Sequence, residues 1–223
     1  MPPRSDRGIG LLELGIKALL SYLVGSLIGS LIVGRLRGGI DIRTQGSGNA
    51  GGTNALRTQG KLFAFWVVFI DLGKSVLAAG WLPHVAIPGV GLDASVDREW
   101  LIMACAASVI IGHVYPLWYG FRGGKGAATL VGALLGIQPA LLLPVLIVWL
   151  IVLLFTGYVG LATMCAGVAL PVYVWATQPV LPPALMTFSA LVATFVIFTH
   201  RSNIARMLHG SEHRTHKLWL LRR

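Results

Sequence analysis

Residues 38–61, GGIDIRTQGSGNAGGTNALRTQGK, form a polar island in an otherwise apolar chain. The island contains seven glycines, three cations and one anion, a composition that fits neither a membrane span nor a buried strand. Glycine tolerates positive φ, so successive backbone N–H groups in residues 46–54 can converge on one point and hold a phosphate. The candidate phosphate ligands are Ser47, Gly48, Asn49, Gly51, Gly52, Thr53, Asn54 and, three residues beyond, Arg57. The alternative is a flexible glycine linker, because such motifs have many false positives.

The composition identifies the protein class. Of 223 residues, 55% are hydrophobic and only 12% are charged, and the mean hydropathy is +0.75, which is too apolar for a soluble domain of this size. The net charge of +10 comes from cations near the ends of apolar segments, so it indicates membrane topology and not nucleic-acid binding. Cys105 and Cys165 lie inside apolar runs and support neither a disulfide nor a metal site.

Apolar runs predict an all-α integral membrane protein, a single polytopic domain over residues 1–223. Residues 1–17 form a polar and amphipathic lead, of which 9–14 can extend the first span. A small-residue face of Ser21, Gly25 and Gly29 in that span allows close helix packing. The expected spans are 18–34, 62–82, 100–119, the run 127–155 divided at Gln138 and Pro139, 161–176 and 184–199.

Charge places the connecting segments on two sides of the membrane. The cation-bearing regions 35–61, 120–126 and 200–223 are expected in the cytoplasm, and 83–99 and 177–183 outside. This arrangement requires an outside N-terminus and an even number of crossings between the second and third basic regions. Dividing the run at Gln138 and Pro139 satisfies the parity and predicts seven transmembrane helices, of which the fourth is short.

Two further features carry charge. Asp71 and Lys74 lie midway along a span at a spacing that puts both on one face, as an ion pair that locks helices or as functional groups. The sequence GGKG at 123–126 precedes the short helix, whose N-terminus and Lys125 would attract an anion. A snorkelling lysine is the alternative. Neither GGKG nor the triplet GKS at 73–75 completes a Walker A loop, because Tyr119 and Val68 stand where its first glycine is required.

The third cluster follows the last span. His200 and Asn203 would face one way on a helix at the cytoplasmic end of that span. A lone histidine at such a position is usually a hydrogen-bonded surface residue. Because this is the third polar cluster expected on one side of the membrane, His200 and Asn203 are candidate catalytic residues, together with Ser47.

The motifs together resemble the bacterial acyl-phosphate-dependent glycerol-3-phosphate acyltransferases. They are GIDIR at 39–43, GSGNAGGTNALR at 46–57, GH at 112–113 with Pro116, GGKG at 123–126, and HRSNIAR at 200–206 with Gly210 and Glu212. The resemblance implies a seven-helix enzyme of the inner membrane with cytoplasmic Gly-rich loops as its active site. It also implies acyl transfer from acyl phosphate to the 1-hydroxyl of sn-glycerol 3-phosphate, giving lysophosphatidic acid and phosphate as the first step of phospholipid synthesis.

Residue types in the motifs fit that chemistry. The neutral nest from Ser47 to Asn54 suits the acyl-phosphate phosphoryl group, and Arg57 and Lys125 suit glycerol 3-phosphate. We expect no cofactor, no metal and no covalent intermediate, a monomer in contact with membrane lipid, and a departing phosphate that takes the proton while His200 and Asn203 position the substrate.

This sequence departs from the family pattern at three positions. Gly52 replaces the usual alanine, and Gly157 and Gly160 stand where an arginine and a serine are frequent. An anion transporter is the alternative function, since transporters also use broken helices and cations. The absence of an internal repeat, and the gathering of all three clusters on one side, favour the enzyme.

Overall fold

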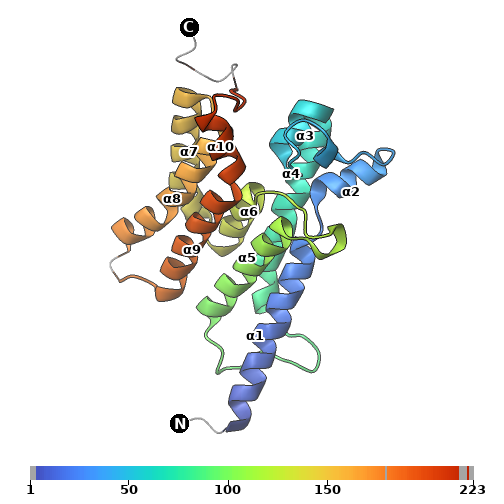
Figure 1. Ribbon diagram of the computed structural model, residues 1–223. Coiled ribbons are helices and arrows are strands. Elements are labelled where there is room, and N and C mark those ends of the chain that lie inside the picture. The colour runs from blue at the N-terminus through green and yellow to red at the C-terminus, as the bar shows by residue number, and fades with distance from the viewer. Residues whose placement is uncertain (1–3, 179, 216–219, 221–223) are drawn as a thin grey trace. The chain divides into compact units, whose positions relative to one another are not determined.

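The computed structural model describes residues 4–178, 180–215 and Leu220. Over these residues the chain is helical and forms no β-strand element (Figure 1). Its α-helices are α1 Arg4–Gly25, α2 Gly29–Leu36, α3 Gly52–Gln59, α4 Lys61–Val76, α5 Arg98–Val114, α6 Ala127–Ile137, α7 Leu142–Thr156, α8 Val159–Thr177, α9 Pro183–Thr199 and α10 Arg201–Leu208. The predicted all-α class is confirmed.

The membrane spans follow from helix length and apolarity. In the part of the chain that the structure describes, four helical segments are long and apolar enough to span: Lys61–His84, Arg98–Tyr119, Pro139–Thr156 and Val159–Thr177. Two bent pairs pass the same test when each pair is taken as one segment, Gly10–Gly25 with Gly29–Leu36 at 45° and Pro183–Thr199 with Arg201–Leu208 at 50°, and each is a broken span or a re-entrant loop. Ala127–Ile137 is a shorter apolar helix. These seven segments agree with the predicted number, and the break at Gln138 and Pro139 is confirmed.

The first span differs from its prediction. We expected a polar and amphipathic lead over 1–17, of which 9–14 could extend a helix over 18–34, but α1 already begins at Arg4 and the helix breaks between Gly25 and Gly29 before α2. The polar lead is helical because Glu13 and Lys17 neutralise each other at 2.7 Å, and both are fully buried. Local composition does not reveal this pairing, since it also depends on partners elsewhere in the chain.

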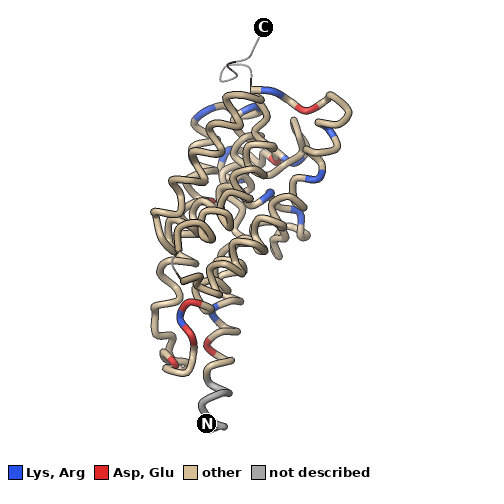
Figure 2. The backbone as a smooth tube through the Cα atoms, turned by 90° about the vertical axis from the view of Figure 1, so that its left-hand side faces the viewer, with Lys and Arg blue, Asp and Glu red and all other residues tan. Residues whose placement is uncertain are grey.

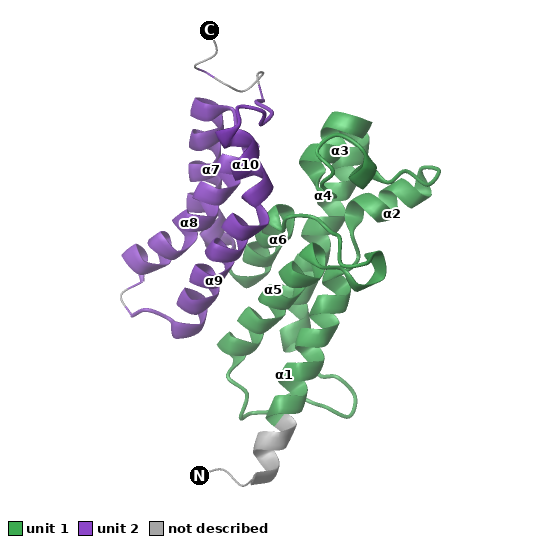
Figure 3. Cartoon of the chain, in the orientation of Figure 1, with its two compact units in different colours: residues 1–138 green, residues 139–223 purple. Residues whose placement is uncertain are grey.

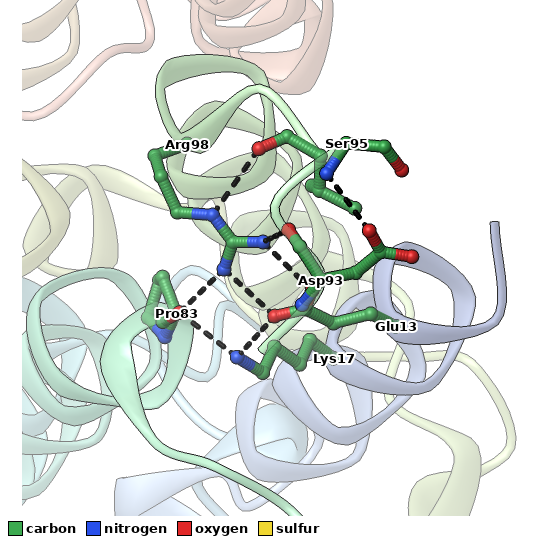
Figure 4. A network of polar contacts seen from close by, with 7 residues as sticks. Glu13, Lys17, Pro83, Asp93, Ser95 and Arg98 are labelled. Carbon is green, nitrogen blue, oxygen red and sulfur yellow. Dashed lines mark hydrogen bonds and ion pairs between the residues drawn. The ribbon is translucent and has the colours of Figure 1, made fainter. Parts of the chain in front are cut away.

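These partners form a polar bracket around Glu13 and Lys17, near the middle of α1 (Figure 4). Arg98 binds both carboxylate oxygens of Glu13 at 2.7 Å, and Lys17 donates to the carbonyl of Pro83 at 2.8 Å. The backbone N–H of Asp93 donates to Glu13 at 2.9 Å. Figure 2 shows acidic residues in the loop beside α1. The part of α1 around Glu13 and the loop between α4 and α5 therefore lie side by side.

The predicted small-residue face is confirmed. A Cβ at Gly25 would overlap the backbone of Val109 in α5, and one at Gly29 would overlap the carbonyl oxygen of Val67 in α4. Glycine at these positions lets the helix backbones touch. Close packing of α1 on α5 and of α2 on α4 fixes the position of the break between α1 and α2.

The chain divides into two compact units, residues 1–138 and 139–223 (Figure 3). In the second unit α8 packs against both α7 and α9, and α10 contacts α8 and α9. The expectation of one domain over the whole chain stays a prediction. The predicted turn residue Pro179 and the basic residues Lys217, Arg222 and Arg223 lie outside the described residues.

Candidate active site

The first glycine loop, residues 37–51, is closed by the side chain of Asn54. The Asn54 amide donates to the carbonyls of Ile42 at 2.9 Å and Gln45 at 3.0 Å, and its oxygen accepts from the backbone N–H of Ser47 at 3.0 Å. Asn54 is only 1% exposed. We expected this amide to bind substrate directly. In the structure both amide hydrogens bind the loop, so Asn54 shapes the nest, and its contact with substrate stays a prediction.

The donors of this nest surround the start of α3. Gly51 precedes the helix in an extended conformation, and the first-turn N–H groups of a helix have no intrahelical partner. Ser47, Gly48 and Thr53 are exposed, and Asn49 is half-buried. Arg57, one turn after Thr53, is exposed on the same helix face. The predicted candidates from Ser47 to Thr53 therefore surround the N-terminus of α3, and Arg57 lies one turn farther along the same helix.

Packing against α4 accounts for the glycine at position 52, where alanine is usual. A Cβ at Gly52 would come within 2.5 Å of a methyl group of Val68 in α4. Val68 occupies the space that a methyl group at position 52 would need, so glycine at this position avoids an overlap with α4.

A clamp that the sequence analysis missed joins the two glycine loops. Arg43 forms an ion pair with Asp41 at 2.8 Å, and its Nη1 donates to the carbonyl of Tyr119 at 3.2 Å and to that of Arg122 at 2.9 Å. The Arg43 guanidinium holds the pKa of the Asp41 carboxyl below its usual value. The ion pair therefore stabilises the clamp above the ordinary aspartate pKa, and this contribution is lost as the pH falls through the lowered pKa. In the sequence, only the two-residue spacing of Asp41 and Arg43 indicated that these two side chains could pair.

The second glycine loop, residues 115–126, is packed onto the end of α5. The N–H groups of Gly123 and Gly124 donate to the carbonyls of Val114 and His113, both at 3.1 Å. A Cβ at Gly124 would overlap Nε2 of His113, and one at Gly123 would overlap the His113 carbonyl. Gly126 ends the loop in the left-handed conformation, at φ +87°, and caps α6. Lys125 is half-buried and directly precedes this helix N-terminus, as predicted.

A buried ionic cluster lies beneath both loops. Asp71 and Lys74 form the predicted pair at 3.0 Å, and Lys74 lies 3.0 Å from Nδ1 of His113. Lys74 also donates to the carbonyls of Gly25 at 2.8 Å and Leu27 at 2.7 Å, where the backbone breaks between α1 and α2. The pair thus satisfies the broken backbone, and only the tertiary structure reveals His113 as its third member.

The second unit carries the remaining candidates. His200 is buried between α9 and α10, and its Nδ1 lies 2.8 Å from the carbonyl of Val196, which makes Nδ1 a donor and Nε2 the acceptor in the neutral ring. Asn203 donates to Glu212 at 2.8 Å, and Glu212 also accepts from Arg206 at 2.6 Å. The backbone carbonyl of Val196 therefore faces the His200 ring nitrogen directly, and the predicted role of His200 and Asn203 in positioning the substrate stays a prediction.

Residues of α10 and of the segment that follows it contact Gly160 and Gly157. The Asn203 side chain packs where a Cβ at Gly160 would lie. Gly157 accepts a hydrogen bond from the backbone N–H of Thr215 at 2.8 Å, and the Arg214 guanidinium lies 4.7 Å from the centre of the Tyr158 ring. The chain after α10 therefore returns a cation to the start of α8.

Comparisons with known proteins identify the family of the chain. The family model for glycerol-3-phosphate acyltransferase matches residues 16–210. A glycerol-3-phosphate acyltransferase of Synechococcus sp. (strain JA-2-3B'a(2-13)) is 41% identical over 208 residues, covering 92% of this chain and 98% of the relative. That of Aquifex aeolicus (strain VF5) is 32% identical over 197 residues, covering 88% and 96%.

Solved structures give the same result. The crystal structure of an integral membrane glycerol 3-phosphate acyltransferase in its glycerol 3-phosphate form matches with a TM-score of 0.77 at 31% identity, over 90% of this chain and 94% of that one. A lysophosphatidic acid form matches with a TM-score of 0.75 at 30% identity. The resemblance seen in the sequence motifs is confirmed, and the protein belongs to the glycerol-3-phosphate acyltransferase family of integral membrane enzymes of lipid biosynthesis.

Proposed function

We propose that the protein transfers a fatty acyl group from acyl phosphate to the 1-hydroxyl of sn-glycerol 3-phosphate, giving lysophosphatidic acid and phosphate. The observation that carries this proposal is the Arg43 clamp, which ties two separate anion-attracting loops together. Both substrates carry a phosphoryl group, so the reaction needs two such sites side by side. The relatives' named substrate, glycerol 3-phosphate, accounts for one of them.

The two loops suit different substrates. The nest at Ser47, Gly48, Asn49, Gly51, Gly52 and Thr53 offers neutral donors, which would stabilise the charge on a departing phosphate. Arg57 and Lys125 offer full charges, which would bind the phosphate of glycerol 3-phosphate.

An apolar groove begins at the nest. A cavity of about 460 Å³ runs from Gly52 and Thr53 along α4, and its further lining residues are Leu56, Ala64, Phe65, Val68, Phe69 and Leu72. Its walls are apolar and its polar end is the start of α3, which matches an acyl chain with a phosphate head.

The reaction itself needs no covalent intermediate. The glycerol oxygen attacks the acyl carbonyl, the bond between that carbon and the phosphate oxygen breaks, and phosphate leaves with the electron pair and takes the hydroxyl proton. In this proposal Ser47 donates to the phosphoryl group, while His200 and Asn203 position glycerol 3-phosphate. No cofactor enters this scheme.

The direct test uses purified protein and radiolabelled glycerol 3-phosphate, with palmitoyl phosphate and palmitoyl-CoA offered in parallel. We expect labelled lysophosphatidic acid with the phosphate donor alone. An equal amount of lysophosphatidic acid from palmitoyl-CoA would contradict the assignment of the nest to the acyl-phosphate phosphoryl group.

His200→Gln tests the path of the proton. Glutamine keeps a hydrogen-bond donor but does not titrate, so we expect measurable activity with an unchanged pH profile above pH 6. The measurement is kcat against pH at saturating substrates. A loss of ~10²–10⁴-fold, the effect of a missing general base, with glycerol 3-phosphate binding intact would instead make His200 the base.

Cysteine labelling tests the proposed location in the bacterial inner membrane with a cytoplasmic active site. In a variant without Cys105 and Cys165, single cysteines at Gln59, Arg122 and Thr215 should react only from the cytoplasmic side. A cysteine at Ala94, in the loop beside the polar bracket, should react only from outside. Labelling of positions 59 and 122 from opposite faces would exclude a shared site.

A further inference from the structure

The break between α1 and α2 supports both glycine loops. Hydroxyl side chains in the last turn of α1, in the break and in the first turn of α2 each form a hydrogen bond with the backbone of a loop. These bonds run from Tyr22 to the carbonyl of Tyr115 at 2.8 Å, from the N–H of Leu117 to Ser26 at 3.2 Å, and from Ser30 to the carbonyl of Ala50 at 2.8 Å. The bond of Ser30 reaches the first glycine loop, directly beside the nest.

The contact between Ser30 and Ala50 is shielded from water. Both residues are fully buried, and Ala50 packs in an apolar cluster with Ile28 and Leu31. A buried carbonyl needs a hydrogen-bond partner, and the Ser30 hydroxyl is the partner of the Ala50 carbonyl. The methyl group and the carbonyl of Ala50 are therefore both held in the core.

This contact also sets the direction of the next backbone donor. The peptide bond between Ala50 and Gly51 is trans and planar, so the N–H of Gly51 points opposite to the carbonyl of Ala50. Because that carbonyl faces Ser30, the Gly51 N–H points away from α2, toward the partly exposed side of the loop. Asn49, another residue of the nest, lies against Gly51, since a Cβ at Gly51 would come within 2.7 Å of its Nδ2.

Gly51 directly precedes α3. The N–H of Ala55 donates to the Gly51 carbonyl at 3.0 Å as the first hydrogen bond of that helix, so the N–H of Gly51 belongs to the helix-start donors that have no intrahelical acceptor. Glycine at position 51 lets the preceding peptide group rotate at little steric cost. The direction of this N–H therefore depends on an anchor, and Ser30 is that anchor.

We propose that Ser30 is a positioning residue, whose hydroxyl holds the Ala50 carbonyl in the core and so keeps the Gly51 N–H aimed into the nest as a hydrogen-bond donor to a bound phosphate group. The identity of that group, the phosphoryl group of acyl phosphate, rests on the proposed function, whereas the direction of the N–H does not. Without the hydroxyl, the Ala50 carbonyl loses its buried partner and turns toward water, and the Gly51 N–H turns out of the nest.

Solution NMR of the full-length protein in detergent observes both ends of this peptide bond. Labelling with ¹³C-carbonyl alanine and ¹⁵N-glycine selects Ala–Gly pairs, of which the sequence has three, at 50–51, 79–80 and 166–167. The signal of the first pair is identified by its loss in Gly51→Ala. Added inorganic phosphate should move the Gly51 N–H proton downfield in the unmodified protein. Ser30→Ala should shift the Ala50 carbonyl carbon and abolish the response to phosphate.

Steady-state kinetics separate positioning from general damage. Ser30→Ala should raise the KM for palmitoyl phosphate about 10-fold, near the lower end of the effect of one hydrogen bond to a charged group, and leave the KM for glycerol 3-phosphate unchanged. Ser75→Ala is the matched control, because Ser75 is also fully buried and its hydroxyl donates to the carbonyl of Asp71 within its own helix at 2.9 Å. The control should change neither KM nor the response to phosphate.

Ser30→Cys guards against a failure of Ser30→Ala to fold. Cysteine is similar in size and keeps a weaker S–H donor, so this variant should fold and show an intermediate carbonyl shift and an intermediate KM for palmitoyl phosphate. The proposal would be overturned by a Gly51 signal that does not respond to phosphate in the unmodified protein, by equal rises of both KM values in Ser30→Ala, or by kinetics equal to those of Ser75→Ala. If Gly51 responds as expected but palmitoyl phosphate gives no product, the proposed function fails and the role of Ser30 stands.

Discussion

Gly124→Ala is expected to lower kcat/KM for glycerol 3-phosphate by about 100-fold, since displacements of about 1 Å at a catalytic site have effects of that size. The added Cβ would overlap Nε2 of His113. The ring has little freedom to retreat, because its other nitrogen lies 3.0 Å from Lys74 and its own carbonyl binds the N–H of Gly124. The loop must move instead, and Lys125 moves with it.

Steady-state kinetics at saturating acyl phosphate measure this effect, and thermal unfolding in detergent separates it from loss of the fold. Overpacking costs ~1–3 kcal/mol of stability, so a modest fall in Tm is expected as well. Gly73→Ala is the matched control, because among the described residues, leaving aside its chain neighbours and the nearby backbone of α4, no atom lies within 4 Å of the added methyl group. Kinetics of Gly124→Ala equal to those of Gly73→Ala would mean that the loop does not depend on its contact with His113.

Arg57→Ala has the second large expected effect, a rise in KM for glycerol 3-phosphate of roughly 10- to 150-fold. This range corresponds to the ~1.5–3 kcal/mol of a hydrogen bond to a charged group. Arg57 is exposed on α3 one turn after Thr53, so its removal leaves no buried cavity. The fold should therefore be unaffected.

Initial rates against glycerol 3-phosphate at fixed palmitoyl phosphate, and then the reverse, distinguish the two substrates. Arg35→Ala removes another exposed arginine, in the last turn of α2 before the first glycine loop, and controls for general loss of positive charge. A rise confined to the KM for acyl phosphate would mean that Arg57 binds acyl phosphate. The proposed division, with neutral donors for acyl phosphate and cations for glycerol 3-phosphate, would then be wrong.

The sequence by itself determined the helices and the positions of the loops. Apolar length and the break at Gln138 and Pro139 predicted the membrane class and the seven segments, because a span must satisfy its backbone within itself and be apolar along its length. Glycine content located both loops, and the spacing of Asp71 and Lys74 predicted their ion pair, since these properties depend on residues close in the chain.

Only the tertiary structure decided what the polar groups in and beneath those loops contact. Arg43 reaches across 79 residues to Arg122, and Glu13 reaches across 85 residues to Arg98, so neither pairing leaves a local pattern. The same holds for Asn54, whose amide could bind substrate or backbone until the fold brought Ile42 and Gln45 to it. Buried polar groups must find partners, and those partners are chosen by packing between distant segments, which periodicity and composition do not encode.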